Sequence, residues 1–107
     1  MTTIEHLLVC LMEECAEVTK DASKALRFGL DNKYQGTFPA ERLAEELDDL
    51  IGVREMLTDR GVIRGPSLES IAAKKQKVIK YMAHDHAQIE DLDDERTNRN
   101  DDEPRRF

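Results

Sequence analysis

Apolar residues recur at alternating steps of three and four in three stretches of this chain, and this spacing limits what the chain can fold into. The first stretch carries the repeat at Ile4, Leu8, Leu11, Cys15, Val18, Ala22 and Ala25. The second carries it at Leu43, Leu47, Leu50, Ile51 and Leu57, and the third at Leu68, Ile71, Ala72, Val78, Ile79 and Met82. Such steps place side chains on one face of an α-helix, whereas strands require strict alternation. The sequence therefore predicts an all-α fold.

Capping signals set the expected bounds of the first helix. Thr2 and Glu5 have the spacing of a capping box, and Gly29 is a natural stop. We therefore expect a helix from about Thr3 to Phe28.

Similar signals bound the other two helices. Pro39 suits the first turn of the second helix, which is expected to end near Gly61. Ser67 is the expected N-cap of the third helix, and the helical periodicity fails after about His86.

The chain of 107 residues is long enough for one modest core, which we assign to a single domain over residues 1–89. From residue 90 onward eight Asp and Glu face four Arg, and few apolar residues remain. We expect residues 90–107 to form an acidic, disordered tail. The net charge of −7 leaves no basic footprint for a nucleic acid polymer.

The sequence also predicts a cytoplasmic protein without a membrane segment. The apolar run from Leu7 to Met12 is too short to span a bilayer, and no basic segment precedes it. Cys10 and Cys15 point to different faces of one helix, so we expect neither a disulfide nor a zinc motif, but buried packing in a reducing compartment.

Two pairs of acidic residues carry the chemistry that the sequence suggests. Glu14 and Glu17 lie three apart on the first helix, and Glu46 and Asp49 lie three apart on the second. Each pair therefore points to one side of its helix, bordering the apolar stripe. If the helices pack antiparallel, four carboxylates converge, and they repel one another unless cations lie between them. An all-oxygen site selects Mg²⁺, for which Mn²⁺ can substitute.

Pattern alone leaves other interpretations open. Glu-x-x-Glu pairs are common on solvated helix faces, and Glu45 with Asp48 has the same spacing on the other flank of the second helix. Asp21 continues the line of Glu14 and Glu17 one turn further, either as an additional ligand or as a supporting or solvated residue.

The segments "EECAE" and "EELDD" together resemble the paired motifs of the MazG-like all-α nucleoside triphosphate pyrophosphohydrolases, particularly small phage and bacterial members. The resemblance covers about residues 5–82. It implies a four-helix-type bundle completed by oligomerisation, as a homodimer or homotetramer. It also implies Mg²⁺-dependent hydrolysis of a (deoxy)nucleoside triphosphate to monophosphate and pyrophosphate. A purine substrate such as dGTP or GTP, used in nucleotide pool control, is the expected preference, with the host cytoplasm as the location if a phage encodes the protein.

The same resemblance assigns Glu14, Glu17, Glu46 and Asp49 as metal ligands. We further expect Glu17 and Glu46 to be catalytic. We expect Glu17 to orient the attacking water or to take its proton.

Cations that bind the phosphates are expected among four basic side chains. Arg54 and Lys75 fall inside the apolar stripes, while Lys24 and Lys74 flank them. Each of the four also has a structural interpretation, either as an exposed helix charge or as a side chain whose stem packs while its charged end reaches water.

Other functions remain compatible with the sequence. One is a non-catalytic helical interaction protein, and another is the same fold acting on a phosphoribosyl nucleotide. The segment "AHDHA", residues 83–87, contains a His-Asp dyad, although metal phosphohydrolases of that type need further ligands.

Overall fold

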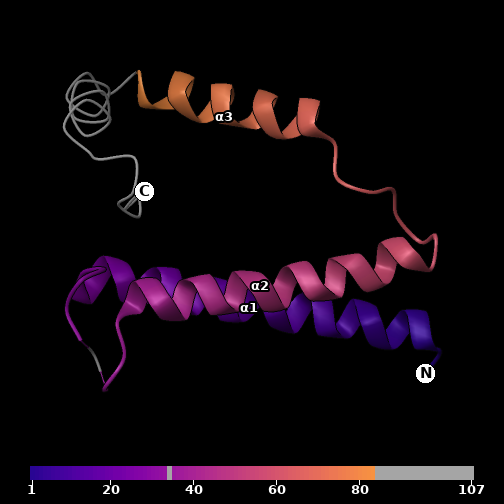
Figure 1. Ribbon diagram of the computed structural model, residues 1–107, viewed down its shortest axis with the longest axis horizontal. Helices are drawn as coiled ribbons and strands as arrows, with labels where there is room; N and C mark the ends of the chain where they lie inside the picture. The colour runs from indigo at the N-terminus through magenta and orange to yellow at the C-terminus, as the bar shows by residue number, and fades with distance from the viewer. Residues whose placement is uncertain (34, 84–107) are drawn as a thin grey trace. The chain divides into compact units, whose positions relative to one another are not determined.

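The computed structural model describes residues 1–33 and 35–83, which form three helices and, within these ranges, no strand. The helices are α1 (Thr3–Phe28), α2 (Pro39–Asp59) and α3 (Leu68–Met82), shown in Figure 1. The predicted all-α fold class is confirmed.

The ends of α1 follow the predicted caps. The backbone N–H of Thr2 donates to Glu5 Oε1 at 2.8 Å, and the backbone N–H of Glu5 donates to Thr2 Oγ1 at 3.1 Å. At the other end Gly29 has φ 86°, which disfavours any residue with a side chain, and its N–H donates to the Ala25 carbonyl at 2.9 Å. The sequence therefore determines both ends of α1 locally.

The predicted starts of α2 and α3 are also observed. Pro39 opens α2, where its missing N–H removes no helical hydrogen bond, and α2 ends at Asp59, two residues before Gly61. Ser67 caps α3, because its Oγ accepts from the backbone N–H of Ser70 at 3.1 Å.

Helices α1 and α2 form an antiparallel hairpin (Figure 1). Their contact is built from buried or half-buried residues that again recur at steps of four and three. In α1 these are Leu7, Leu11, Glu14, Val18, Asp21 and Ala25; in α2 they are Pro39, Leu43, Glu46, Leu50, Val53 and Leu57. Three acidic residues thus occupy positions that apolar residues occupy elsewhere in the repeat.

The packed face is rotated from the predicted stripes. Ile4, Leu8, Leu47 and Ile51, which we expected in the contact, are 41 to 51% exposed. The predicted stripe of α1 included Ile4 and Leu8 and left out Leu7, so its direction differs from that of the face that α2 covers. The exposed members form a second apolar surface on the hairpin.

The described chain divides into two units after Gly65, and α3 belongs to the second unit. We describe α3 by itself: none of its residues is buried, and Leu68 and Tyr81 are the most exposed of its large apolar side chains. The predicted tail, residues 90–107, and the His-Asp dyad lie outside the described residues.

Both cysteines are free, and one prediction for them was wrong. Cys10 is half-buried, but Cys15 is exposed, because it follows the packed residue Glu14 by one position and so lies on the same side of the hairpin as Leu8. Within residues 1–33 and 35–83, no helix combines the length and the apolar character needed to cross a membrane.

The rotated packing predicts unequal effects of two identical substitutions. Leu57 is 1% exposed and Leu26 is 81% exposed. Leu57→Ala is expected to lower the free energy of unfolding by about 2 to 5 kcal/mol, because it leaves a cavity in the helix contact. Leu26→Ala is expected to lower it by less than about 1 kcal/mol. Urea denaturation measures both values, and equal losses would contradict the observed packing.

Candidate metal centre

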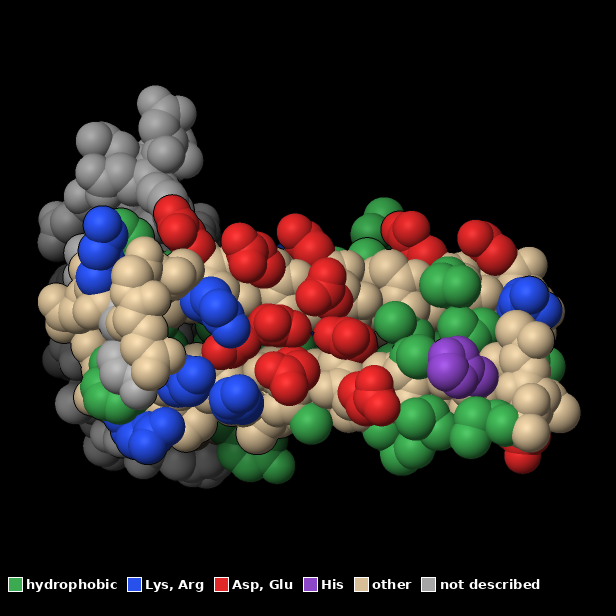
Figure 2. All heavy atoms as spheres, turned by 90° about the horizontal axis from the view of Figure 1, so that it is seen from below, with side chains coloured by type: hydrophobic (Ala, Val, Ile, Leu, Met, Phe, Trp, Pro, Cys, Tyr) green, Lys and Arg blue, Asp and Glu red, His purple; other side chains and the backbone are tan. Residues whose placement is uncertain are grey.

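Five carboxylates gather at the middle of the hairpin in two groups that share Glu46. One oxygen each from Glu14, Glu46 and Asp49 lie within 4.8 Å of one another, and so do oxygens from Glu17, Asp21 and Glu46. Figure 2 shows acidic side chains gathered over the middle of the packed helices, with Lys and Arg side chains at the end nearest the hairpin loop. Both α1 and α2 contribute to each group, so the hairpin itself builds the cluster.

Helical spacing explains the grouping. Glu14 and Asp21 are seven residues apart in the packed face of α1, with Glu17 between them, three residues after Glu14. On α2, Asp49 follows Glu46 by three residues, which is nearly one turn. Antiparallel packing places Glu46 opposite the segment between Glu14 and Asp21. Glu46 is therefore close enough to both residues to belong to both groups.

Asp21 is the most unusual member of the cluster. Its side chain is 2% exposed, and its Oδ2 accepts no hydrogen bond from the described residues. Of the roles left open for Asp21, the solvated one does not fit the structure, since its position in the packed face removes it from water. A buried carboxylate oxygen without a partner destabilises a protein unless a cation compensates it.

Glu46 experiences the charge of the whole cluster. Loss of hydration raises the pKa of Glu46 above its usual value, and neighbouring negative charges raise it further. Those neighbours, in decreasing order of effect, are Asp21, Asp49, Glu17 and Glu14. Glu46 is thus the residue on which repulsion within the cluster concentrates.

The geometry also separates the two possible registers on α2. Glu46 is half-buried and approaches Glu14, whereas Glu45 and Asp48 are exposed and belong to neither carboxylate group found among the described residues. The pair Glu46 and Asp49 is therefore the one that the structure brings to α1.

The cluster has the chemical character of a site for hard divalent cations. Both groups consist of carboxylates, and Mg²⁺ or Mn²⁺ bind carboxylate oxygens in preference to softer ligands. Each group supplies three oxygens, which leaves coordination positions for water or for substrate oxygens.

The four predicted substrate-binding cations lie in different places. Lys24 is half-buried on α1, one turn beyond Asp21, and lines the same cavity as Asp21. Arg54 is half-buried on α2, and its Nε is buried without a hydrogen-bond partner among the described residues. Lys74 and Lys75 are exposed on α3, which is described by itself, so their role stays a prediction.

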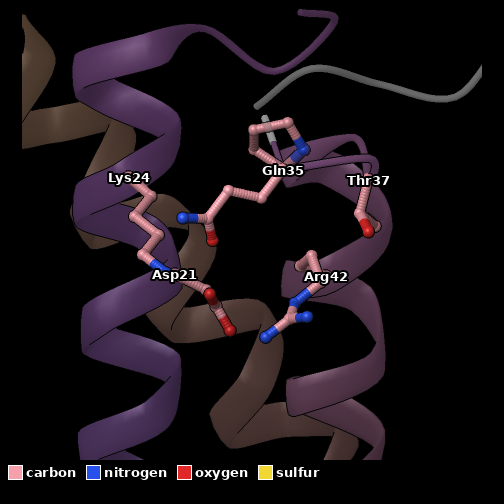
Figure 3. A pocket seen from close by; sticks show the side chains of 6 residues that line it. Asp21, Lys24, Gln35, Thr37 and Arg42 are labelled. Carbon is pink, nitrogen blue, oxygen red and sulfur yellow. The ribbon is translucent and has the colours of Figure 1, made fainter. Parts of the chain in front are cut away.

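Three polar residues of that cavity, Gln35, Thr37 and Arg42, were missed by the sequence analysis. Arg42 extends from α2 and Gln35 from the loop toward the space beside Asp21 (Figure 3). A signal for Arg42 was present, because it precedes Glu46 by four residues and therefore lies on nearly the same side of the helix. The position of Gln35 has no comparable signal, since it depends on the path of the loop.

Comparison of this chain with family models, with curated proteins and with solved structures finds no match. The resemblance to the MazG-like superfamily accordingly rests on the two acidic motifs described above.

Repulsion within the cluster predicts that Glu46→Gln stabilises the cation-free fold at neutral pH. The raised pKa of Glu46 means that its protonated form favours folding, so wild-type stability falls relative to the variant as pH rises through that pKa. Thermal melts in EDTA from about pH 4 to pH 8 measure the difference, which should shrink at the acidic end. The exposed neighbour variant Glu45→Gln should change little. A Glu46→Gln protein that melts below wild type in EDTA would contradict this account.

Proposed function

We propose that this protein is a Mg²⁺-dependent hydrolase that converts a (deoxy)nucleoside triphosphate to the monophosphate and pyrophosphate. The observation that carries the proposal is the pair of carboxylate groups joined at Glu46 on the facing sides of two helices. The buried, unpartnered oxygen of Asp21 supports it independently, because a purely solvated acidic face has no reason to bury such a group.

The five carboxylates form two groups of three, so the proposal places one divalent cation at each group. In the proposal Glu14, Glu46 and Asp49 hold one cation, Glu17, Asp21 and Glu46 hold the other, and Glu46 is a ligand of both. Mn²⁺ is expected to replace Mg²⁺, since both prefer oxygen ligands.

The carboxylates then have defined roles in hydrolysis. Divalent cations held by these residues would neutralise the triphosphate and lower the pKa of a coordinated water. Glu17 orients this water toward the α-phosphorus or takes its proton, while Glu46 keeps the two ligand groups in a fixed relation. Asp21 is excluded from water, so it holds its cation from the buried side of the cluster.

Substitution of the cluster tests the proposal. Glu17→Gln and Glu46→Gln are expected to lower turnover at least about a hundredfold, because each deletes a ligand charge and keeps the side-chain shape. Glu45→Gln is the matched control: it is exposed, adjacent in sequence and outside both groups. The assay supplies each NTP and dNTP with Mg²⁺, and a phosphoribosyl nucleotide in a separate arm, and identifies the phosphate product. Full turnover in both cluster variants, or no release of pyrophosphate from any triphosphate, would refute the proposal.

The resemblance to small phage and bacterial members favours a purine such as dGTP or GTP and a role in nucleotide pool control in the cytoplasm. The same substrate panel tests this preference.

We also propose that a second copy of the chain completes a four-helix-type bundle. Leu8 follows the packed residue Leu7, and Leu47 and Ile51 follow the packed residues Glu46 and Leu50. Successive side chains on a helix point about 100° apart. In two antiparallel helices, the residues that immediately follow the packed positions therefore point to the same side of the hairpin on both helices. These exposed apolar residues therefore share one side of the hairpin, and Met12, 64% exposed, extends it on α1. A shared apolar surface of this kind marks a protein contact.

Light scattering tests the assembly. The expected mass is that of a dimer or tetramer, and Leu47→Asp should shift it toward the monomer, because a charge at the contact is costly to desolvate. A wild-type mass near 12.3 kDa at micromolar concentration would contradict self-association.

A further inference from the structure

A cavity of about 70 Å³ lies where the end of α1, the following loop and the start of α2 meet. Its lining residues are Asp21, Lys24, Gln35, Thr37, Pro39 and Arg42. Figure 3 shows the Asp21 and Arg42 side chains pointing toward each other from the two helices, with the Gln35 amide entering from the loop. The cavity therefore adjoins the carboxylate cluster through Asp21.

The size of the cavity limits its occupant. A water molecule needs about 10 to 15 Å³ of such space, so 70 Å³ accommodates roughly five to seven groups of that size. A phosphate group has five non-hydrogen atoms. The cavity thus has room for one phosphate group, but not for a nucleoside.

The lining favours an anion once Asp21 is compensated. Lys24 and Arg42 bring two positive charges, and Gln35 and Thr37 bring hydrogen-bond donors. Among the described lining residues, Asp21 brings the carboxylate that opposes an anion, and one of its oxygens lies within 4.8 Å of oxygens of Glu17 and Glu46. A divalent cation at that group would turn the repulsion into attraction, since a phosphate oxygen can be its next ligand.

We propose that this cavity is a phosphate subsite, in which Arg42 and Lys24 bind one phosphate group of a substrate whose neighbouring oxygens lie on the cation at Asp21. The inference rests on the proposed function in one respect, the cation at Asp21. Arg42 supplies the planar, doubly donating group that suits phosphate oxygens, and Lys24 supplies a compact charge.

The position of Arg42 favours it over the other cation of α2. Arg42 lies four residues before Glu46, about 6 Å along the helix axis, whereas Arg54 lies eight residues after it, about 12 Å in the opposite direction. The chain of phosphates therefore runs from the carboxylates toward the hairpin loop.

The backbone of Gln35 supplies a separate observation. Gln35 has φ 51°, a left-handed conformation that costs a residue with a side chain roughly 1 to 2 kcal/mol relative to right-handed geometry. Strained residues of this type cluster at ligand sites, and the side chain of Gln35 enters the cavity. Glycine would adopt the same φ without strain.

Inorganic pyrophosphate is the probe, titrated calorimetrically into the full chain with Mg²⁺ and, separately, with EDTA. Arg42→Gln is expected to weaken binding about 10- to 100-fold, because it removes charge-assisted hydrogen bonds. Arg60→Gln is the matched control at the other end of α2, roughly 27 Å away along the helix, and should bind as wild type does. Mg²⁺ titrated alone should bind wild type and Arg42→Gln equally.

Gln35→Gly separates ligand binding from folding. It should weaken pyrophosphate binding while the melting temperature stays level or rises, an outcome that a purely structural role for Gln35 would not give.

The outcomes distinguish this inference from the proposed function. Wild-type affinity in Arg42→Gln, or no pyrophosphate binding by a wild type that binds Mg²⁺, overturns the subsite and leaves the metal function standing. Arg42-dependent pyrophosphate binding without any Mg²⁺ binding supports the anion subsite and overturns the metal function. Absence of binding by both ligands overturns both.

Discussion

Repulsion between carboxylates across the contact of α1 and α2 is the constraint on which the rest of this structure depends. Glu14, Asp21 and Glu46 occupy packed positions of α1 and α2 at which the repeat elsewhere has apolar residues. The acidic middle of the contact is therefore held together by the apolar packing nearer the two ends of the hairpin. The raised pKa of Glu46 reflects both lost hydration and this repulsion. A ligand that binds only the folded hairpin and neutralises these charges would stabilise the fold as it creates the site. In the proposed function, folding and cation binding are therefore coupled.

The hairpin has one charged side and one apolar side. The residues of one side immediately precede the packed positions in the sequence, and those of the other side immediately follow them. Residues one step before the packed positions include Glu17, Lys24, Arg42 and Asp49, all charged. Residues one step after them include the exposed apolar side chains on both helices, such as Leu8. Because the helices are antiparallel, each set lies on one side of the pair. The proposed chemistry and the proposed contact with a second chain therefore use opposite sides and need not compete for surface.

The sequence predicted the helices better than it predicted their packed faces. Caps at Thr2 and Ser67 and stops such as Gly29 act through neighbouring residues, so their effects are readable locally. The phase of the stripe depends on which partner covers it, and the predicted face of α1 followed Leu8 where the structure buries Leu7. The burial of Asp21 was not predicted either. Packed positions were inferred from the recurrence of apolar residues, and a carboxylate at such a position does not fit that recurrence. The position of Gln35 depends on the loop, whose path no spacing rule predicts, whereas the spacing of Arg42 from Glu46 was a signal that the sequence analysis did not use.

The central claim is that the two carboxylate groups form paired cation sites that share Glu46, and Mn²⁺ titration monitored by electron paramagnetic resonance tests it most directly. The account predicts two Mn²⁺ ions per chain with a spin-coupled spectrum, since Glu46, which belongs to both carboxylate groups, would be a ligand of both ions. In Glu46→Gln the coupling should vanish and the affinity for both ions should fall. Failure of the wild-type protein to bind Mn²⁺, or binding of uncoupled ions that Glu46→Gln leaves unchanged, would contradict it.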